Sequence, residues 1–166
     1  FTLAFAIVFW SCKTASSTSD FYVKEEIQVN INLKEIKDDK VLVTVKSPKI
    51  KTDEVIYHLP KTVPGTYSED HYGRYVEDVK AFDKKGNALK VTSIDKNSWS
   101  ISNAKALDKI TYLVNDTYDV ETGKGFGSDV ISSPAGSNID AAKNIMLSTH
   151  CFVGYFSNYM DVPYKL

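Results

Sequence analysis

Apolar and polar residues alternate along much of the chain, beginning in the segment from Phe21 to Leu33. Its odd positions are apolar except for Glu25, and its even positions are mainly polar. A period of two predicts a half-buried strand and excludes an amphipathic helix. The alternation resumes at Val41, Val43 and Val45 after a turn at 37–40, which predicts a β-hairpin.

More short segments of this kind follow, each separated from the next by turn residues. Pro60 and Pro64 interrupt regular pairing because proline donates no backbone hydrogen bond, and Gly65 is expected in a conformation that other residues avoid. The pattern predicts an all-β fold, an antiparallel β-sandwich-like domain with a long Gly-rich loop and at most a short helix. The further strands are expected at 54–59, 78–82, 88–94, 98–102 and 109–116.

The remaining part of the chain is less regular. Val120–Asn138 holds four glycines and a proline, which predicts a long surface loop, and long loops in compact domains are often functional. We expect one helical turn at Ile139–Asn144 and a last buried strand at Ile145–Val153. Val162–Leu166 is expected to be a strand interrupted by the end of the chain, because domains seldom finish on an unpaired apolar edge.

The first residues predict export. Phe1–Trp10 is apolar but far shorter than the ~20 residues of a membrane-spanning helix, and it fits the apolar region of a signal peptide. Ser11 before Cys12 is typical of a bacterial lipoprotein signal. Cys12 would then carry a lipid that anchors a periplasmic or outer-membrane protein. A plain secretory signal and a buried N-terminal strand are the alternatives.

These features divide the chain into a signal peptide at 1–12, a flexible Ser- and Thr-rich tether at 13–20 and one folded domain at 21–166. The length of 166 residues and the apolar fraction of 43% suit one domain with a sizeable core. The formal net charge of −1 excludes a nucleic-acid partner, which would need a basic excess.

Several short motifs follow one another in a definite order. The series resembles the N-terminal domain of the M61 family of metallopeptidases, the glycyl-aminopeptidase type that often carries a PDZ domain. The resemblance extends over roughly Phe21–Leu166. Its motifs are Leu59-Pro60, Pro64-Gly65-Thr66-Tyr67, Gly73-Arg74-Tyr75-Val76, Ala81-Phe82-Asp83, Trp99, Ile110-Thr111-Tyr112, Pro134-Ala135-Gly136-Ser137-Asn138, Ser148-Thr149-His150 and Gly154-Tyr155-Phe156.

The resemblance implies a β-rich domain in front of a catalytic domain that binds zinc through His-Glu-x-x-His. None of the three histidines, His58, His71 and His150, precedes a glutamate. We therefore expect no catalytic residue, metal or cofactor in this chain, and we expect zinc in the absent catalytic domain. The chain would be a C-terminally truncated piece whose partners are that catalytic domain and peptide substrates. The whole protein would remove N-terminal residues by means of a zinc-activated water.

Four residues are candidates for the domain interface or the cleft: Tyr67, Arg74, Tyr75 and Phe126. A guanidinium makes bidentate bonds to carboxylates and stacks on rings. Arg74 would contact the catalytic domain or a peptide carboxylate, or it would be an internal pin on Tyr67 or Tyr72 tied to an aspartate. Phe126 belongs to the Gly-rich loop, which either rims the cleft or is an ordinary loop.

The histidines and cysteines have ordinary interpretations too. His58 is expected on the solvent side of its strand, and His71 in a charged loop. His150 and Cys151 are expected to pack within a strand, because no second pair of ligands lies at zinc-site spacing. A disulfide between Cys151 and Cys12 is the alternative in an oxidising periplasm.

A competing hypothesis is a stand-alone surface lipoprotein, a β-sandwich that binds a glycan or a protein partner. Its contact residues would be Trp99, Tyr112 and Tyr118, although Trp99 also fits a sandwich core. A structural module that only mediates assembly is a third hypothesis.

Overall fold

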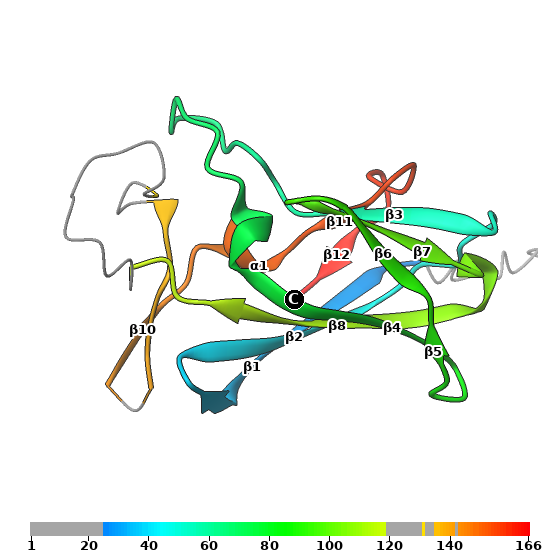
Figure 1. Ribbon diagram of the computed structural model, residues 1–166, viewed down its shortest axis with the longest axis horizontal. Coiled ribbons are helices and arrows are strands. Elements are labelled where there is room, and N and C mark those ends of the chain that lie inside the picture. The colour runs from blue at the N-terminus through cyan, green and yellow to red at the C-terminus, as the bar shows by residue number, and fades with distance from the viewer. Residues whose placement is uncertain (1–24, 119–130, 132–134, 142) are drawn as a thin grey trace, which may run out of the picture.

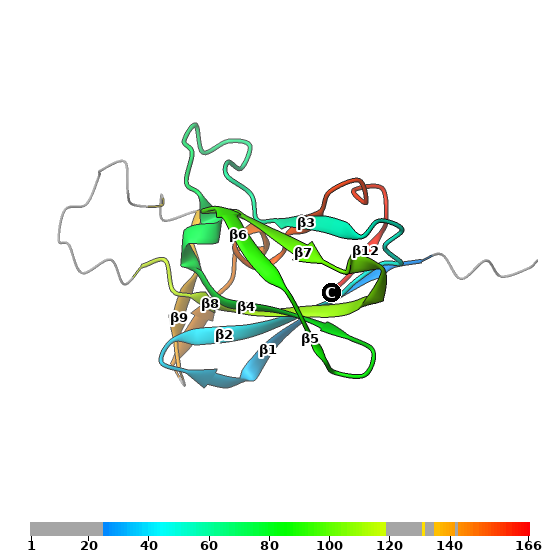
Figure 2. The same cartoon turned by 45° about the vertical axis from the view of Figure 1, so that its right-hand side comes forward.

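Strands with one apolar side stack here as two β-sheets around a shared hydrophobic core, as Figures 1 and 2 show. The computed structural model describes residues 25–118, 131, 135–141 and 143–166. The fold confirms the expected all-β, sandwich-like class. The segments 1–12 and 13–20, Cys12 and Phe126 lie outside the described residues.

The larger sheet has six strands in the order β12-β1-β2-β8-β4-β5. Neighbours pair antiparallel, except that β12 runs parallel to β1. The predicted hairpin is present, and both residues of its turn, Asp38 and Asp39, have left-handed backbone that aspartate tolerates. The strands are β1 (Ile27–Lys37), β2 (Lys40–Lys46), β4 (Val76–Asp83), β5 (Ala88–Leu89), β8 (Leu107–Asn115) and β12 (Tyr164–Lys165).

The smaller sheet has four antiparallel strands in the order β11-β3-β7-β6. After β3 the chain leaves the sheet at Pro60, and Gly65 has the expected positive φ of 97°. Two 3₁₀ turns, η1 (Tyr72–Tyr75) and η2 (Ala104–Ala106), precede β4 and β8. The strands are β3 (Glu54–His58), β6 (Val91–Asp95), β7 (Ser98–Ser102) and β11 (Tyr155–Phe156).

The alternation of apolar and polar residues predicted where these strands lie, but it did not predict which strands pair with each other. The expected strand at 88–94 is divided at Lys90, so that β5 pairs in the larger sheet and β6 in the smaller one. A period-two pattern shows which side chains are buried and cannot show that a strand changes sheets.

Three expectations near the end of the chain are wrong. Residues 139–144 form no helical turn, because β9 (Asn138–Asp140) and β10 (Asn144–Met146) pair as a hairpin. Residues 145–153 do not form one buried strand, because β10 ends at Met146 and α1 (Thr149–Phe152) follows. The loop expected at 120–138 is not all surface either: Ile131, Ala135 and Ser137 are buried. Short apolar runs fit a strand and a buried helical turn equally well, so tertiary packing decided between them.

Two tyrosines join the sheets inside the core. The hydroxyls of Tyr57 on β3 and Tyr112 on β8 are 2.9 Å apart. Tyr112 donates to the Phe152 carbonyl at 2.6 Å, and the Gly154 N–H donates to the Tyr57 hydroxyl at 3.0 Å. Tyr112 has one hydroxyl proton and donates it to the Phe152 carbonyl. In the bond between the two hydroxyls, Tyr57 is therefore the donor. This chain of hydrogen bonds ties α1 and the following turn to both sheets.

Gly154 belongs to the Gly-Tyr-Phe motif, and its place in the core explains the missing side chain. A Cβ there would lie 2.1 Å from the His58 carbonyl oxygen and 2.7 Å from the Tyr57 ring. The close approach that lets its N–H reach Tyr57 therefore requires glycine.

Among the described residues, the structure contains no helix with the length and apolar character of a membrane span.

Candidate functional site

Polar residues from distant parts of the chain meet beside η1 and α1, at the end of the sandwich where the β9–β10 hairpin lies (Figure 1). We call this group the end cluster. Five of its nine members belong to the motifs that carry the family resemblance. Its members are Asp70, Tyr72, Gly73, Asn97, Thr117, Gly136, Ser137, Ser148 and His150.

Asn97, in the turn between β6 and β7, holds η1 against the smaller sheet. Its side-chain oxygen accepts from the Gly73 N–H at 3.0 Å, and its amide nitrogen donates to His71 Nδ1 at 2.8 Å. A neutral His71 then carries its proton on Nε2, which lies 3.6 Å from a Glu69 oxygen. A Cβ on Gly73 would lie 2.3 Å from the Lys96 carbonyl oxygen. Glycine is thus the only residue type that fits at position 73.

Asp70 places a buried carboxylate beside η1. Its side chain is 4% exposed and accepts from Ser68 Oγ at 2.8 Å and from the Tyr72 hydroxyl at 3.1 Å. Burial raises the pKa of Tyr72, and the Asp70 charge raises it further. The Tyr72 ring meets the His150 ring edge-on at 4.7 Å, and His150 Nε2 donates to the Ala135 carbonyl at 2.7 Å. The arrangement connects η1, α1 and the segment at 135–137.

Thr117 and Ser137 bind each other in the same region. The Thr117 N–H donates to the Ser137 carbonyl at 3.0 Å, and the Ser137 N–H donates to Thr117 Oγ1 at 2.8 Å. Ser148 donates its N–H to Ser137 Oγ at 2.9 Å and its hydroxyl to the Gly136 carbonyl at 2.7 Å. A Cβ on Gly136 would lie 2.4 Å from Thr117 Oγ1. These groups satisfy one another's hydrogen-bonding capacity, and they hold the end of β8 to the segment before α1.

His58 forms a second polar group at the edge of the smaller sheet. Its Nδ1 lies 2.9 Å from Ser98 Oγ and its Nε2 2.8 Å from Ser157 Oγ, and the Tyr155 ring stacks on the imidazole at 5.0 Å. The Ser98 hydroxyl also bonds the Asp95 carboxylate. A carboxylate only accepts, so the Ser98 hydroxyl donates to Asp95 and must accept from His58 Nδ1–H. His58 Nε2 then carries no proton and accepts from the Ser157 hydroxyl.

This order of hydrogen bonds places an imidazole base beside a serine hydroxyl. His58 is therefore not a simple solvent-side residue, as the alternation predicted, but a half-buried bridge between three segments. Burial lowers its pKa, and the Asp95 charge acts in the opposite direction. The ring consequently favours its neutral form.

The predicted interface residues lie together near η1, apart from Phe126, which is outside the described residues. Tyr67 is fully exposed on the loop between β3 and η1, so it cannot be the ring on which Arg74 packs. The Arg74 guanidinium lies instead over the ring of Tyr75, 5.0 Å from its centroid. Burial raises the pKa of Tyr75, while the Arg74 charge and hydrogen bond lower it.

The other candidates have the following positions. Trp99 and Tyr112 are 8% and 1% exposed, so they are core residues and not the surface contacts of a stand-alone binding protein. Tyr118 is 38% exposed. Cys151 does pack inside the protein and His150 is half-buried, although both lie in α1 and not in a strand. His71 lies in a polar loop, as expected, and also binds Asn97.

Sequence reasoning missed Asn97, Thr117 and the two serines that bind His58. Each is a small polar residue next to a turn, a place where such residues are common for local reasons. Their roles follow from contacts between residues 20 to 99 positions apart. No local signal could have identified them.

Within the described residues, no three or more His, Cys, Asp or Glu side chains are grouped so that they could hold a metal ion. The end cluster offers hydroxyls, one carboxylate and backbone groups that are already bonded to each other. Chemically, it can fix the relative positions of η1, α1 and β8. It thereby sets the base of the loop that carries Tyr67.

Comparison with known proteins agrees with the motif order. A family model described as the Peptidase M61 N-terminal domain matches residues 28–166. The structure of an aminopeptidase N family protein from Idiomarina loihiensis has a similar fold, with a TM-score of 0.67 and 19% identity over 83% of this chain. This chain covers 21% of the length of that one. A search of curated proteins finds no match. Since the family match extends over well more than half of its length, the chain belongs to the Peptidase M61 N-terminal domain family.

Proposed function

We propose that this domain is the non-catalytic front part of an exported M61-type zinc aminopeptidase, where it packs against the catalytic domain and helps wall the substrate cleft. The family match over residues 28–166 is the observation that carries the proposal. Zinc would be held by the catalytic domain, and peptides would be its substrates. A lipid on Cys12 would anchor the protein in the periplasm or at the outer membrane of a bacterium.

The loop that carries Tyr67 is the surface best suited to docking. Its base is closed by the His71 N–H donating to the Lys61 carbonyl at 2.9 Å and by the Tyr72 N–H donating to the Pro60 carbonyl at 3.1 Å. Tyr67 is 100% exposed near its tip. An exposed aromatic ring on a loop with a fixed base loses little conformational freedom on binding, and such rings often dominate interfaces. Arg74 and Tyr75 follow directly after the loop.

The isolated chain should hydrolyse nothing. Incubation of the purified 166-residue chain with zinc and a series of amino-acyl anilides should release no product above the blank, because the catalytic motif is not in the sequence. Turnover by this chain that a chelator abolishes would refute the non-catalytic role.

The cleft role is tested in the complete natural protein. Tyr67→Ala should raise KM for peptide substrates several-fold, without changing zinc content or the midpoint of unfolding. Leu33→Ala, a matched change at a residue 42% exposed on β1, should leave KM unchanged. Unaltered KM and kcat in Tyr67→Ala would contradict the contact at the cleft, while the family membership would stand.

A further inference from the structure

The outer face of the larger sheet carries a row of side chains that the proposed peptidase role does not use. Strand pairing places Lys165 beside Gln28, Gln28 beside Lys46, Lys46 beside Lys109, and Lys109 beside Phe82. Five neighbouring strands thus contribute one residue each. We call this set the lysine row.

The lysine row points away from the core. The inward neighbours of its members, Val45, Ile110 and Ala81, are 0%, 0% and 1% exposed. Successive residues of a strand point to opposite faces, so Lys46, Lys109 and Phe82 lie on the outer one. The row is therefore available to a partner.

The lysines of this row carry like charges that repel one another. Lys46 and Lys109 are paired directly across β2 and β8, and like charges in that position are destabilising. Among the described residues, no carboxylate forms an ion pair with either of them, and Lys165 has only Glu26, at 4.0 Å. The Lys109 ammonium lies 5.8 Å from the centre of the Phe82 ring. Lys46 and Lys109 therefore present to an anion positive charge that no ion pair among the described residues compensates. The other lysines of this face, Lys40 and Lys80, are paired with Glu77 and Asp78.

The next row along the same face can form hydrogen bonds and is uncharged on three strands, where Asn30, Thr44 and Thr111 stand side by side across β1, β2 and β8. It ends on β4 at Lys80, whose charge is paired with Asp78 at 2.6 Å. The two rows line shallow hollows of about 460 Å³ and about 340 Å³. Amide and hydroxyl groups next to ammonium groups suit a ligand that carries both hydroxyls and carboxylates.

We propose that this face binds a linear acidic polysaccharide that lies across the strands. Neighbouring strands are ~4.8 Å apart, which is comparable to the length of one pyranose unit in a linear glycan. Each strand can then meet one sugar. Lys46 and Lys109 bind its carboxylates, Asn30, Thr44 and Thr111 bind its hydroxyls, and Phe82 packs on a sugar ring.

The same spacing disfavours other polyanions. An extended acidic peptide repeats every ~3.3 Å and would fall out of step with the strands. Nucleic acid needs several more phosphate contacts than this face offers. The residues of this face differ from Trp99, Tyr112 and Tyr118, the contacts expected for a stand-alone binding protein. Glycan binding here is also independent of the proposed peptidase role. Its failure would leave the proposed function unaffected.

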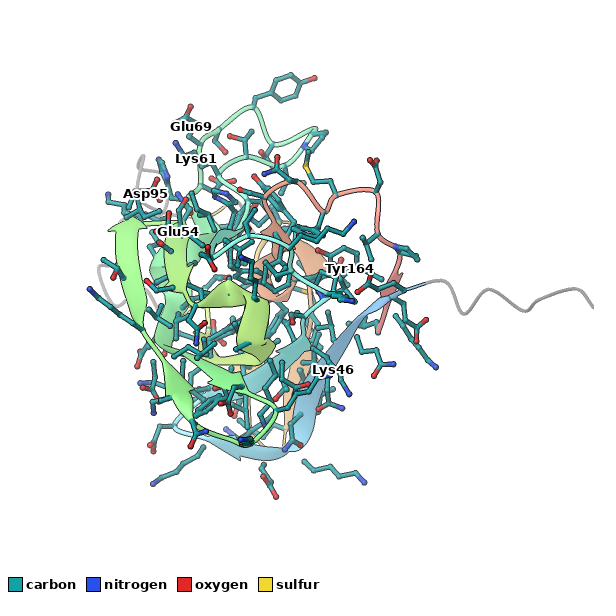
Figure 3. All side chains as sticks on the ribbon, turned by 90° about the vertical axis from the view of Figure 1, so that its right-hand side faces the viewer. Lys46, Glu54, Lys61, Glu69, Asp95 and Tyr164 are labelled. Carbon is teal, nitrogen blue, oxygen red and sulfur yellow. The ribbon has the colours of Figure 1, made fainter. Side chains whose placement is uncertain are left out.

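The test measures binding of polygalacturonate to the whole 166-residue chain by calorimetry at low salt. The double variant Lys46→Gln/Lys109→Gln should bind roughly tenfold more weakly, because it loses two charge-assisted contacts. The matched control Lys61→Gln/Lys96→Gln removes the same charge from exposed positions elsewhere and should bind like the wild type. Figure 3 shows Lys61 far from Lys46, on the opposite side of the molecule.

Several outcomes would overturn the proposal. They are no binding of polygalacturonate by the wild type, an equal loss in both double variants, or equal affinity for poly-L-glutamate or anionic lipid vesicles. Dextran, a neutral glycan, should bind much more weakly than polygalacturonate. Phe82→Ala should weaken binding several-fold while the unfolding midpoint shows that the fold is kept. Wild-type affinity in both Lys46→Gln/Lys109→Gln and Phe82→Ala would refute the assignment of these residues.

Discussion

Tyr57 and Tyr112 are each fully or almost fully buried, yet each carries a hydroxyl that must find a partner. Burial raises the pKa of both, so both stay neutral. Each hydroxyl donates one hydrogen bond and accepts another within a chain that begins at the Gly154 N–H and ends at the Phe152 carbonyl. Two side chains therefore satisfy two backbone groups, one at the end of α1 and one just after it.

Removal of one hydroxyl should destabilise the domain. Tyr57→Phe leaves the Gly154 N–H without its acceptor, and Tyr112→Phe leaves the Phe152 carbonyl without its donor. Each change should lower the free energy of unfolding by about 1–3 kcal/mol in urea titrations. The double variant should lose less than the sum of the two, because the hydroxyls share a bond.

Tyr67→Phe is the control, and since its ring is 100% exposed it should change stability by less than about 0.5 kcal/mol. Strictly additive losses in the double variant would show that the two hydroxyls are not coupled.

At the scale of elements, His58 joins β3, β7 and the turn after β11. Its ring touches Ser98, Ser157 and Tyr155, and none of these lies on its own strand. Burial lowers the pKa of His58 below its ordinary value of 6.5. The unfolded chain therefore takes up this proton at a higher pH than the folded one. The stabilisation is present above pH 6.5 and is lost as the pH falls through the folded pKa.

His58→Gln should flatten this dependence. Unfolding by urea between pH 7.5 and the carboxyl range should show a smaller decline in the variant than in the wild type, with each free energy compared with its own value at ~pH 7.5. Asp95 and Glu77 also have lowered pKa values, but their effect begins below their ordinary values of 3.8 and 4.5. Parallel pH curves for the two proteins would rule out His58 as the source.

The elements were in large part predictable. The β1–β2 hairpin, β3, β4, β7 and β8 all follow from period-two alternation, because one side of each strand faces a core. Residues 139–153 were not predictable, because a hairpin and one turn of helix there are shorter than a reliable period. Lys90 marks the other failure, since the change of sheet between β5 and β6 leaves no local trace.

At the scale of the whole molecule, Cys151 shows what packing of distant segments does. Its thiol is 1% exposed and lies 3.7 Å from the Ala135 carbonyl oxygen. Burial raises the pKa of the Cys151 thiol to about 11, while a hydrogen bond with Ser137 acts in the opposite direction. The thiolate is the reactive species, so both exposure and charge oppose reaction.

The native thiol should be inert. In a chain with Cys12→Ser, Ellman's reagent at ~pH 8 should leave Cys151 unmodified for as long as the fold persists, and it should react at once in denaturant. Rapid modification of the folded chain would contradict the burial of α1 and would reopen the alternative of a disulfide with Cys12.

The candidate site was predicted only in outline. The motif order placed Tyr67, Arg74 and Tyr75 in one segment, and the structure puts that segment beside the end cluster. Asn97 could not be singled out, because its two side-chain bonds, to Gly73 in η1 and to His71 just before it, reach back 24 and 26 residues. The lysine row could not be predicted either, since it depends on the register of five strands.

The sequence by itself determined the all-β class, most strand positions and the family, because alternation and motif order are properties of neighbouring residues. The motifs that carry the resemblance also include Gly73, Gly136 and Gly154, but nothing in the sequence shows why these positions hold glycine. Only the tertiary structure decided that Gly73, Gly136 and Gly154 each face a backbone or side-chain atom within 2.4 Å of a missing Cβ. The same holds for His58, the end cluster and the lysine row. Contacts between residues far apart in the chain are set by strand register and sheet packing, which no local pattern encodes.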